Sequence, residues 1–311
     1  MTKTKKVIVF AFLTLFPLAL IVGYTSSKVN FSFLKKAAEQ LPDSGVGSDF
    51  QADKIFGQSG FTENSPNQVV NNRVFHPQGF AIDKNTTPNK IYIWDSGNHR
   101  ILGLTAGREA ADLVFGQPDF NHASCNGSNT TDLPNASAST LCSQVFGQIS
   151  LMESPQPNSM AVDNNHNFYA FDPYNHRVLK YNDPYSSDKS QGKGDTIADF
   201  VWGQPNFESK QPNQGGALSN KTLSGGYGVG IDVDAQGNVW VVDVGNKRVL
   251  RFPPNNKEAD LVLGQQDFTS VNGTACSQCY KDGQDTDQTR IRVCQGVPPP
   301  INFFCFPRTA K

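Results

Sequence analysis

Four similar ten-residue segments occur along this chain of 311 residues, and no other feature constrains its fold as strongly. Self-similarity along a sequence is the signature of repeat architectures, in which each repeat buries its apolar face against the next. The four copies are ADKIFGQSGF (52–61), ADLVFGQPDF (111–120), ADFVWGQPNF (198–207) and ADLVLGQQDF (259–268).

A second unit lies between these copies and occurs three times, at 77–104, 157–181 and 228–252. Each copy contains a short apolar strand that ends in Asp, a turn, and a second apolar strand that ends in another Asp. Asn-His-Arg or Asn-Lys-Arg then opens a third strand, and the ADLVFGQ-type segment supplies a fourth. Four consecutive antiparallel strands in a fixed order predict the blade of a β-propeller, so we expect an all-β fold with about three blades.

These units resemble NHL repeats, and the GQPDF segments resemble those of bacterial-type surface proteins built from such repeats. The resemblance covers 52–311 and implies a ring of about six four-stranded blades, which this chain leaves incomplete. Residues 306–311 resemble the opening of a further unit, so we predict a fragment that stops inside its fourth repeat. The alternative is a three-bladed protein that completes itself by oligomerising. We expect 54–58 to form the outer strand of the last blade.

Three lysines among the first six residues precede an uncharged, largely apolar stretch, Val7–Val22. Its length falls between the core of a signal peptide, about 7 to 15 residues, and a spanning helix of about 20. Positive charge before such a segment keeps that end in the cytoplasm and sends the rest across the membrane. We therefore predict a protein that is secreted, or anchored in the membrane with an extracytoplasmic domain. The predicted parts are a signal peptide or transmembrane anchor (1–24), a linker or stalk (25–50) and a partial propeller (51–311).

The element Asp-x-x-Asn-His/Lys-Arg follows the second strand of every unit. A catalytic residue has no reason to recur identically in every blade, whereas an Asp at a hairpin turn can accept backbone N–H groups. We interpret the element as structural and expect its Arg to pair with a neighbouring Asp and join one blade to the next. Its members are Asp95, Asn98 and Arg100, then Asp172, Asn175 and Arg177, then Asp243, Asn246 and Arg248.

Metal-binding candidates are few, and we predict no resident cofactor. Lys247 replaces in the third unit the histidines that the first two units carry at this turn, which argues against a shared metal role. His76 is the one histidine expected near the mouth of a central channel, where related propeller lyases hold Zn²⁺. The resemblance to lactonase-like propellers makes the first-strand Asp residues Ca²⁺ candidates, although we favour the interpretation that they cap the following turn. These residues are Asp83, Asp163 and Asp234.

The chain has six cysteines, all in predicted connections between blades. An even number in an exported chain predicts disulfides. Cys125 and Cys142 form the natural pair because they share one connection, while the other four allow three pairings that the sequence leaves open. Those four are Cys276, Cys279, Cys294 and Cys305.

Asn-x-Ser/Thr sequons predict a glycoprotein if the cell glycosylates exported proteins. They begin at Asn30, Asn85, Asn126, Asn129, Asn135, Asn220 and Asn272.

The leading functional hypothesis is a non-enzymatic binding or scaffold module that recognises a protein or carbohydrate through its loops. The formal charge is −1 and no basic run follows the first few residues, which excludes nucleic acid as a partner. Loops on a rigid frame usually carry recognition, so 121–157 and the cysteine-rich segment after Phe268 are the expected contact regions. The membrane is a partner only through the N-terminal segment. The alternative is a channel-centred, metal-dependent enzyme of the lyase or lactonase type.

Overall fold

A computed structural model describes residues 52, 54–64, 67–127, 135–143, 159–225 and 230–271, together with two short strands at 292–293 and 304–305. The chain divides into two units, 1–55 and 56–311, and the fold described below belongs to the second. The predicted anchor and stalk lie outside the described residues, as do Cys276, Cys279, Cys294 and the side chain of Cys305. Within the part that is described, no helix has the length and apolar character needed to cross a membrane.

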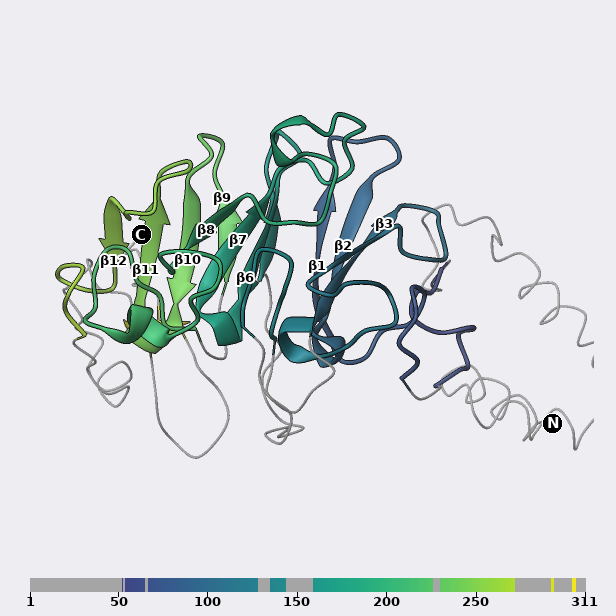
Figure 1. Ribbon diagram of the computed structural model, residues 1–311, viewed down its shortest axis with the longest axis horizontal. Coiled ribbons are helices and arrows are strands. Elements are labelled where there is room, and N and C mark those ends of the chain that lie inside the picture. The colour runs from purple at the N-terminus through teal and green to yellow at the C-terminus, as the bar shows by residue number, and fades with distance from the viewer. Residues whose placement is uncertain are drawn as a thin grey trace, which may run out of the picture. The chain divides into compact units, whose positions relative to one another are not determined.

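Each of the three repeats forms one four-stranded antiparallel sheet, with its strands paired in chain order (Figure 1). The 3-10 turns η1 (Ser96–Asn98), η3 (Pro173–Asn175) and η6 (Val244–Asn246) join the second and third strands. A separate two-stranded sheet pairs β13 (Arg292–Val293) with β14 (Phe304–Cys305). The first sheet contains β1 (Pro77–Asp83), β2 (Lys90–Asp95), β3 (Arg100–Thr105) and β4 (Leu113–Phe115); the second β5 (Met160–Val162), β6 (Phe168–Asp172), β7 (Arg177–Tyr181) and β8 (Phe200–Trp202); the third β9 (Ile231–Val233), β10 (Val239–Asp243), β11 (Arg248–Phe252) and β12 (Leu261–Leu263).

The burial pattern of the second strands reflects the stacking of the sheets. All five residues of β6 are buried, because the second sheet has a neighbour on each face. In β10 buried and half-buried residues alternate, which is the period-2 pattern of a strand packed on one face only. The aromatic rings of Tyr92 and Phe168 stack across the first interface, with centroids 4.0 Å apart. A continuous apolar run in the middle repeat therefore matches a strand that is covered on both faces.

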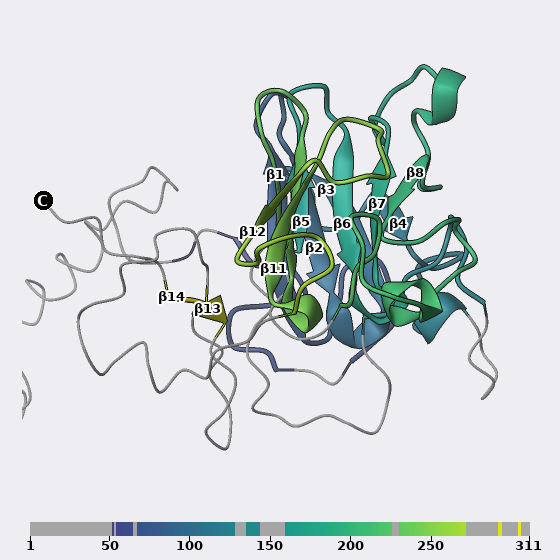
Figure 2. The ribbon, with the colours of Figure 1, turned by 90° about the vertical axis from the view of Figure 1, so that its left-hand side faces the viewer.

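The first strands of the three sheets, β1, β5 and β9, lie next to one another, and the sheets stack face to face (Figure 2). Two apolar clusters fill the spaces between consecutive sheets. Sheets of four antiparallel strands that pack face to face with their first strands together define a propeller-like fold. The predicted all-β fold with about three blades is confirmed.

Residues 54–58, expected to form the outer strand of a last blade, pair with none of the three described sheets. Gly57 instead makes an isolated parallel bridge with Arg73, close to the entrance of the first blade.

Candidate functional site

The connections between blades share one end of the sheets with the turns η1, η3 and η6. Consecutive strands are antiparallel, so the turn after each second strand and the connection after each fourth strand emerge at the same end. We call this the loop end and the opposite one the turn end. In Figure 1 the loop end of the three sheets lies at the bottom.

At the loop end of the second blade, a buried carboxylate organises the hairpin turn. Asp172 and Arg177 have fully buried side chains, and Arg177 Nε donates to Asp172 Oδ2 at 2.9 Å. The same oxygen accepts from Asn175 Nδ2 at 2.6 Å, and Oδ1 accepts from the backbone N–H of Cys142 at 2.9 Å. A buried charge is tolerated when it is paired and hydrogen-bonded in this way.

The remaining guanidinium N–H groups of Arg177 reach the connections on both sides of the blade. Nη1 donates to the carbonyl of Phe207, in the connection that leaves the blade. Nη2 donates to the carbonyls of Ser137 at 3.0 Å and Thr140 at 2.8 Å, in the connection that enters it. Each Arg pairs with a neighbouring Asp and contacts the connections to both adjoining blades. The carboxylate partner belongs to the same turn, and it is backbone carbonyls that the Arg uses to hold the connections.

The same network occurs in the first and third blades. Arg100 pairs with Asp95 at 2.7 Å and Arg248 with Asp243 at 2.8 Å, all with fully buried side chains. The ADLVFGQPDF-type segment therefore has a physical role at its last position, because the carbonyl of that Phe accepts an Arg Nη1 in every blade. The carbonyl acceptors are Phe120, Val70 and Arg73 for Arg100, and Phe268, Ser219 and Thr222 for Arg248.

Each network contains a second asparagine that the sequence analysis missed. The amide of Asn126 exchanges two hydrogen bonds with that of Asn175, at 2.8 and 3.3 Å. The spacing between the two asparagines is 31, 49 and 33 residues in the three blades, so no fixed motif reveals them. A glycan on Asn126 would break this buried pair, which makes its sequon unsuitable for modification in the folded chain. The corresponding pairs are Asn67 with Asn98 and Asn213 with Asn246.

The electrostatics of these networks favour structure over chemistry. Burial raises the pKa of the Asp172 carboxyl, while Arg177 and the hydrogen bonds from Asn175 and Cys142 oppose that rise. Both carboxylate oxygens already accept hydrogen bonds from the protein. A group bound on every side in this way has no position from which to act on a substrate.

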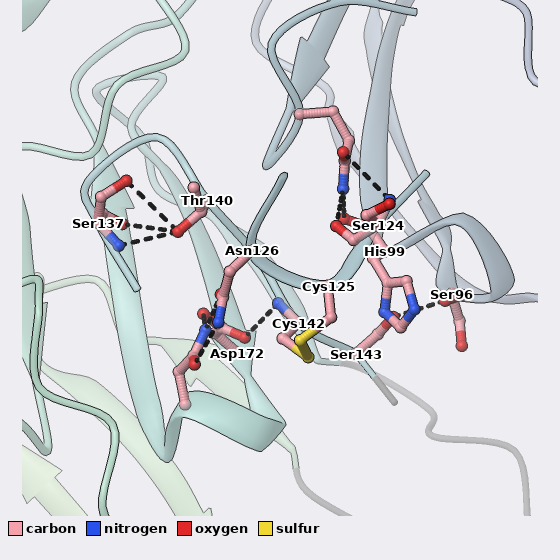
Figure 3. The surroundings of a disulfide bond; sticks show 12 residues. Ser96, His99, Ser124, Cys125, Asn126, Ser137, Thr140, Cys142, Ser143 and Asp172 are labelled. Atoms are coloured by element: carbon pink, nitrogen blue, oxygen red, sulfur yellow. Dashed lines mark hydrogen bonds between the residues drawn. A yellow bond between two sulfur atoms is a disulfide. The ribbon is translucent and has the colours of Figure 1, made fainter. Parts of the chain in front are cut away.

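His99, inside the first turn, is held neutral. Burial lowers the pKa of His99 to about 4. Ser143 Oγ donates to the carbonyl of Ser96 at 2.5 Å and lies 3.1 Å from His99 Nδ1, so the hydroxyl oxygen accepts the Nδ1 proton (Figure 3). The imidazole therefore links the turn of the first blade to the connection that enters the second.

The connection into the second blade is closed by the predicted disulfide between Cys125 and Cys142, which are 17 positions apart (Figure 3). Cys125 directly precedes Asn126, and Cys142 supplies the N–H that reaches Asp172. The disulfide thus joins two of the segments through which this connection contacts the turn, one beside Asn126 and one at Cys142. A disulfide fits an extracellular or secreted protein.

The residues considered as metal ligands are not brought together. His76 is exposed, with its ring against Phe75. Asp163 accepts four hydrogen bonds from its own blade, including one from Tyr169 Oη at 2.9 Å. Among the residues that the structure describes, no group of three or more His, Cys, Asp or Glu side chains could hold a metal ion.

The fold and these networks define a class: an all-β, propeller-like protein whose blades are joined at the loop end by buried carboxylate–guanidinium networks. No family model matches the sequence, and no curated protein matches it. Among solved structures, the chain is similar to virginiamycin B lyase from Staphylococcus aureus (10% identity over 63% of this chain and 44% of that one, TM-score 0.30). It is also similar to a streptogramin B lyase (12%, 64% and 58%, TM-score 0.26) and to a luciferin-regenerating enzyme (12%, 58% and 60%, TM-score 0.23). The chain thus spans less than two thirds of each of these proteins, and its fold is assigned from its own three sheets.

Proposed function

We propose that this chain is an extracytoplasmic NHL-type propeller that binds a protein or carbohydrate ligand through its loop end and serves as a binding or scaffold module. The observation that carries the proposal is the repetition of the loop-end network. In every blade a buried Arg fixes the connections on both sides to one hairpin turn. A surface of this kind is organised before a partner arrives, which reduces the ordering cost of binding.

The compartment is supported by two independent features. The Cys125–Cys142 disulfide is of the kind that persists in oxidising environments. The uncharged apolar stretch Val7–Val22, preceded by lysines, is typical of a segment that directs export.

The loop end also offers exposed polar side chains in three successive connections. Asn121, Glu208 and Gln266 are exposed and follow the fourth strands of the first, second and third blades. They stand close in sequence to the Phe carbonyls that the buried Arg residues hold. A ligand that contacts all three connections would therefore meet backbone already fixed by the networks.

The test uses the full chain and two triple variants, one altered at the loop end and one at the turn end. One carries Asn121→Lys, Glu208→Lys and Gln266→Lys at the loop end. The other carries Lys84→Glu, Glu109→Lys and Ser187→Lys, all exposed in turns at the turn end. The probes are a glycan array and immobilised surface-protein and polysaccharide fractions of the producing cell, with binding followed by interferometry.

We expect the loop-end variant to lose at least ten-fold in affinity for the probe that binds, and the turn-end variant to retain its affinity. The opposite pattern, or equal losses, would overturn the loop-end assignment. Elemental analysis of the same preparation is the second readout. Stoichiometric Zn²⁺ or Ca²⁺ would argue against a binding module and for the channel-centred lyase or lactonase alternative.

A further inference from the structure

A small polar cleft lies at the turn end, between the second and third blades, away from the loop-end surface. Its volume is about 230 Å³, and it is lined by the turn from β5 to β6, the turn from β9 to β10, Lys180 of β7 and Asn255. This volume is below the roughly 300 Å³ at which drug-sized pockets begin, so it suits a single ring rather than an extended ligand.

The second and third repeats differ at one position beside the cleft. In the second blade, His166 lies three positions after Asp163, which caps the turn, and its Nδ1 lies 2.7 Å from Asp83 of the first blade. The equivalent position in the third blade is Gly237. Both residues have positive φ angles, +65° and +81°, so the backbone is alike.

Because Gly237 has no side chain, nothing from that position fills the space toward the second blade. A Cβ built on Gly237 would meet Pro254 no closer than 3.4 Å, so there is room for a side chain. The imidazole that bridges the first pair of blades thus has no counterpart at the second pair, and the cleft lies beside that position.

The two carboxylates in the cleft are already committed to the protein. Asp163 accepts from two backbone N–H groups, from Asn167 Nδ2 and from Tyr169 Oη. Asp234 accepts from two backbone N–H groups, from Asn238 Nδ2 and from Trp240 Nε1. They cap their turns, and they have no lone pair left for a metal ion or a ligand ammonium. Their two negative charges against the single positive charge of Lys180 make the cleft unfavourable for anions.

The groups that remain for a ligand are an ammonium and side-chain amides. Lys180 Nζ donates to Asn255 Oδ1 at 3.2 Å, and an ammonium has three N–H donors. Partial burial lowers the pKa of Lys180, with Asp163 and Asp199 opposing the shift. The exposed amides of Asn165 and Gln236 each donate and accept, which is the pattern that hydroxyl groups match.

We propose that this cleft binds one neutral, hydroxyl-bearing ring, the size of a single sugar residue. The hydroxyl oxygens accept from Lys180, the amides of Asn165 and Gln236 exchange hydrogen bonds with the remaining hydroxyls, and the buried rings of Tyr169 and Trp202 form the floor. The site is independent of the loop end, so either proposal can fail without the other.

The test is a titration of the full chain, followed by NMR, with glucose, galactose, mannose and N-acetylglucosamine, and with gluconate as an anionic comparator. We expect millimolar binding of at least one neutral sugar and none of gluconate. Methyl glycosides of the sugar that binds distinguish the source, since retained binding indicates the end of a polysaccharide and lost binding indicates a free sugar.

The repeats supply matched variants. Gly237→His rebuilds in the third blade the side chain that fills the first interface, and we expect it to weaken sugar binding at least ten-fold. Lys180→Met should do the same. His166→Gly removes a side chain that contacts Asp83 of the first blade and does not line the cleft, and it should leave the affinity within two-fold. The proposal is overturned if none of the four sugars binds at tens of millimolar, or if Gly237→His, folded by circular dichroism, binds as the unaltered chain does.

Discussion

Removal of the Cys125–Cys142 disulfide should lower the free energy of unfolding by about 3 kcal/mol. The bond closes a loop of 17 positions, and the entropy of closing a loop of that size in the unfolded chain corresponds to about 3 kcal/mol at 25 °C. A further contribution of about 1 kcal/mol is expected if the loosened connection releases the hydrogen bond from Cys142 N–H to Asp172. The disulfide lies in the connection of the second blade, where the two paired asparagines are 49 residues apart. The corresponding spacings in the other two blades are shorter, 31 and 33 residues.

The assay is urea denaturation of the double variant Cys125→Ala/Cys142→Ala against the unaltered chain. Substitution leaves the other four cysteines as they are, which chemical reduction would not. A control with Asn135→Ala and Ser139→Ala alters exposed side chains of the same connection and should change stability by less than about 0.5 kcal/mol. A loss below about 1 kcal/mol in the disulfide variant would refute the reasoning, because the Asp172 network would then hold the connection without the crosslink.

Three further predictions can be measured by the same denaturation assay. Arg177→Met leaves the buried Asp172 carboxylate without its cation and should lower the free energy of unfolding by about 3 to 5 kcal/mol. Lys221→Met, which removes one partner of an exposed ion pair, should lower it by less than about 1 kcal/mol. Equal losses would contradict a stabilising role for the buried networks. His99 has a pKa of about 4 in the folded chain and about 6.5 in the unfolded chain, so protons bind the unfolded chain more readily. The free energy of unfolding should therefore fall as the pH drops from about 6.5 to about 4. His99→Gln should remove up to about 3 kcal/mol of this pH dependence. Gly203→Ala should lower the free energy of unfolding by about 1 to 3 kcal/mol more than Gly107→Ala. Both glycines have positive φ, but only a Cβ at Gly203 would meet neighbouring atoms, the closest at 2.6 Å. Equal losses for the two variants would contradict the close packing at Gly203.

The sequence predicted the blades well because the repeat carries the information for them. Strand order, the position of the hairpin turns and the Cys125–Cys142 pair all follow from local spacing within one unit. The pairing expected for 54–58 stays a prediction, because it involves a last blade other than the three described, and Gly57 here bridges to Arg73.

The candidate site was harder to predict, for reasons that the asparagine pairs make clear. Asn126 lies 49 residues from Asn175, and a left-handed φ of +54° is what turns it toward its partner. The polar cleft lies beside Gly237, which has no side chain. Sequence motifs are recognised from the side chains that are present, so no motif indicates this cleft. What His166 contacts was likewise invisible, because Asp83 lies 83 positions away in the previous blade.

Buried carboxylates should fix the connections at the loop end before any ligand binds. Amide hydrogen exchange tests it most directly, because the N–H groups of Phe75, Cys142 and Ser224 each donate to one of these carboxylates from a segment outside the strands. We expect these three amides to exchange as slowly as those inside β6. Exchange as fast as in exposed turns, with the strands still protected, would contradict it.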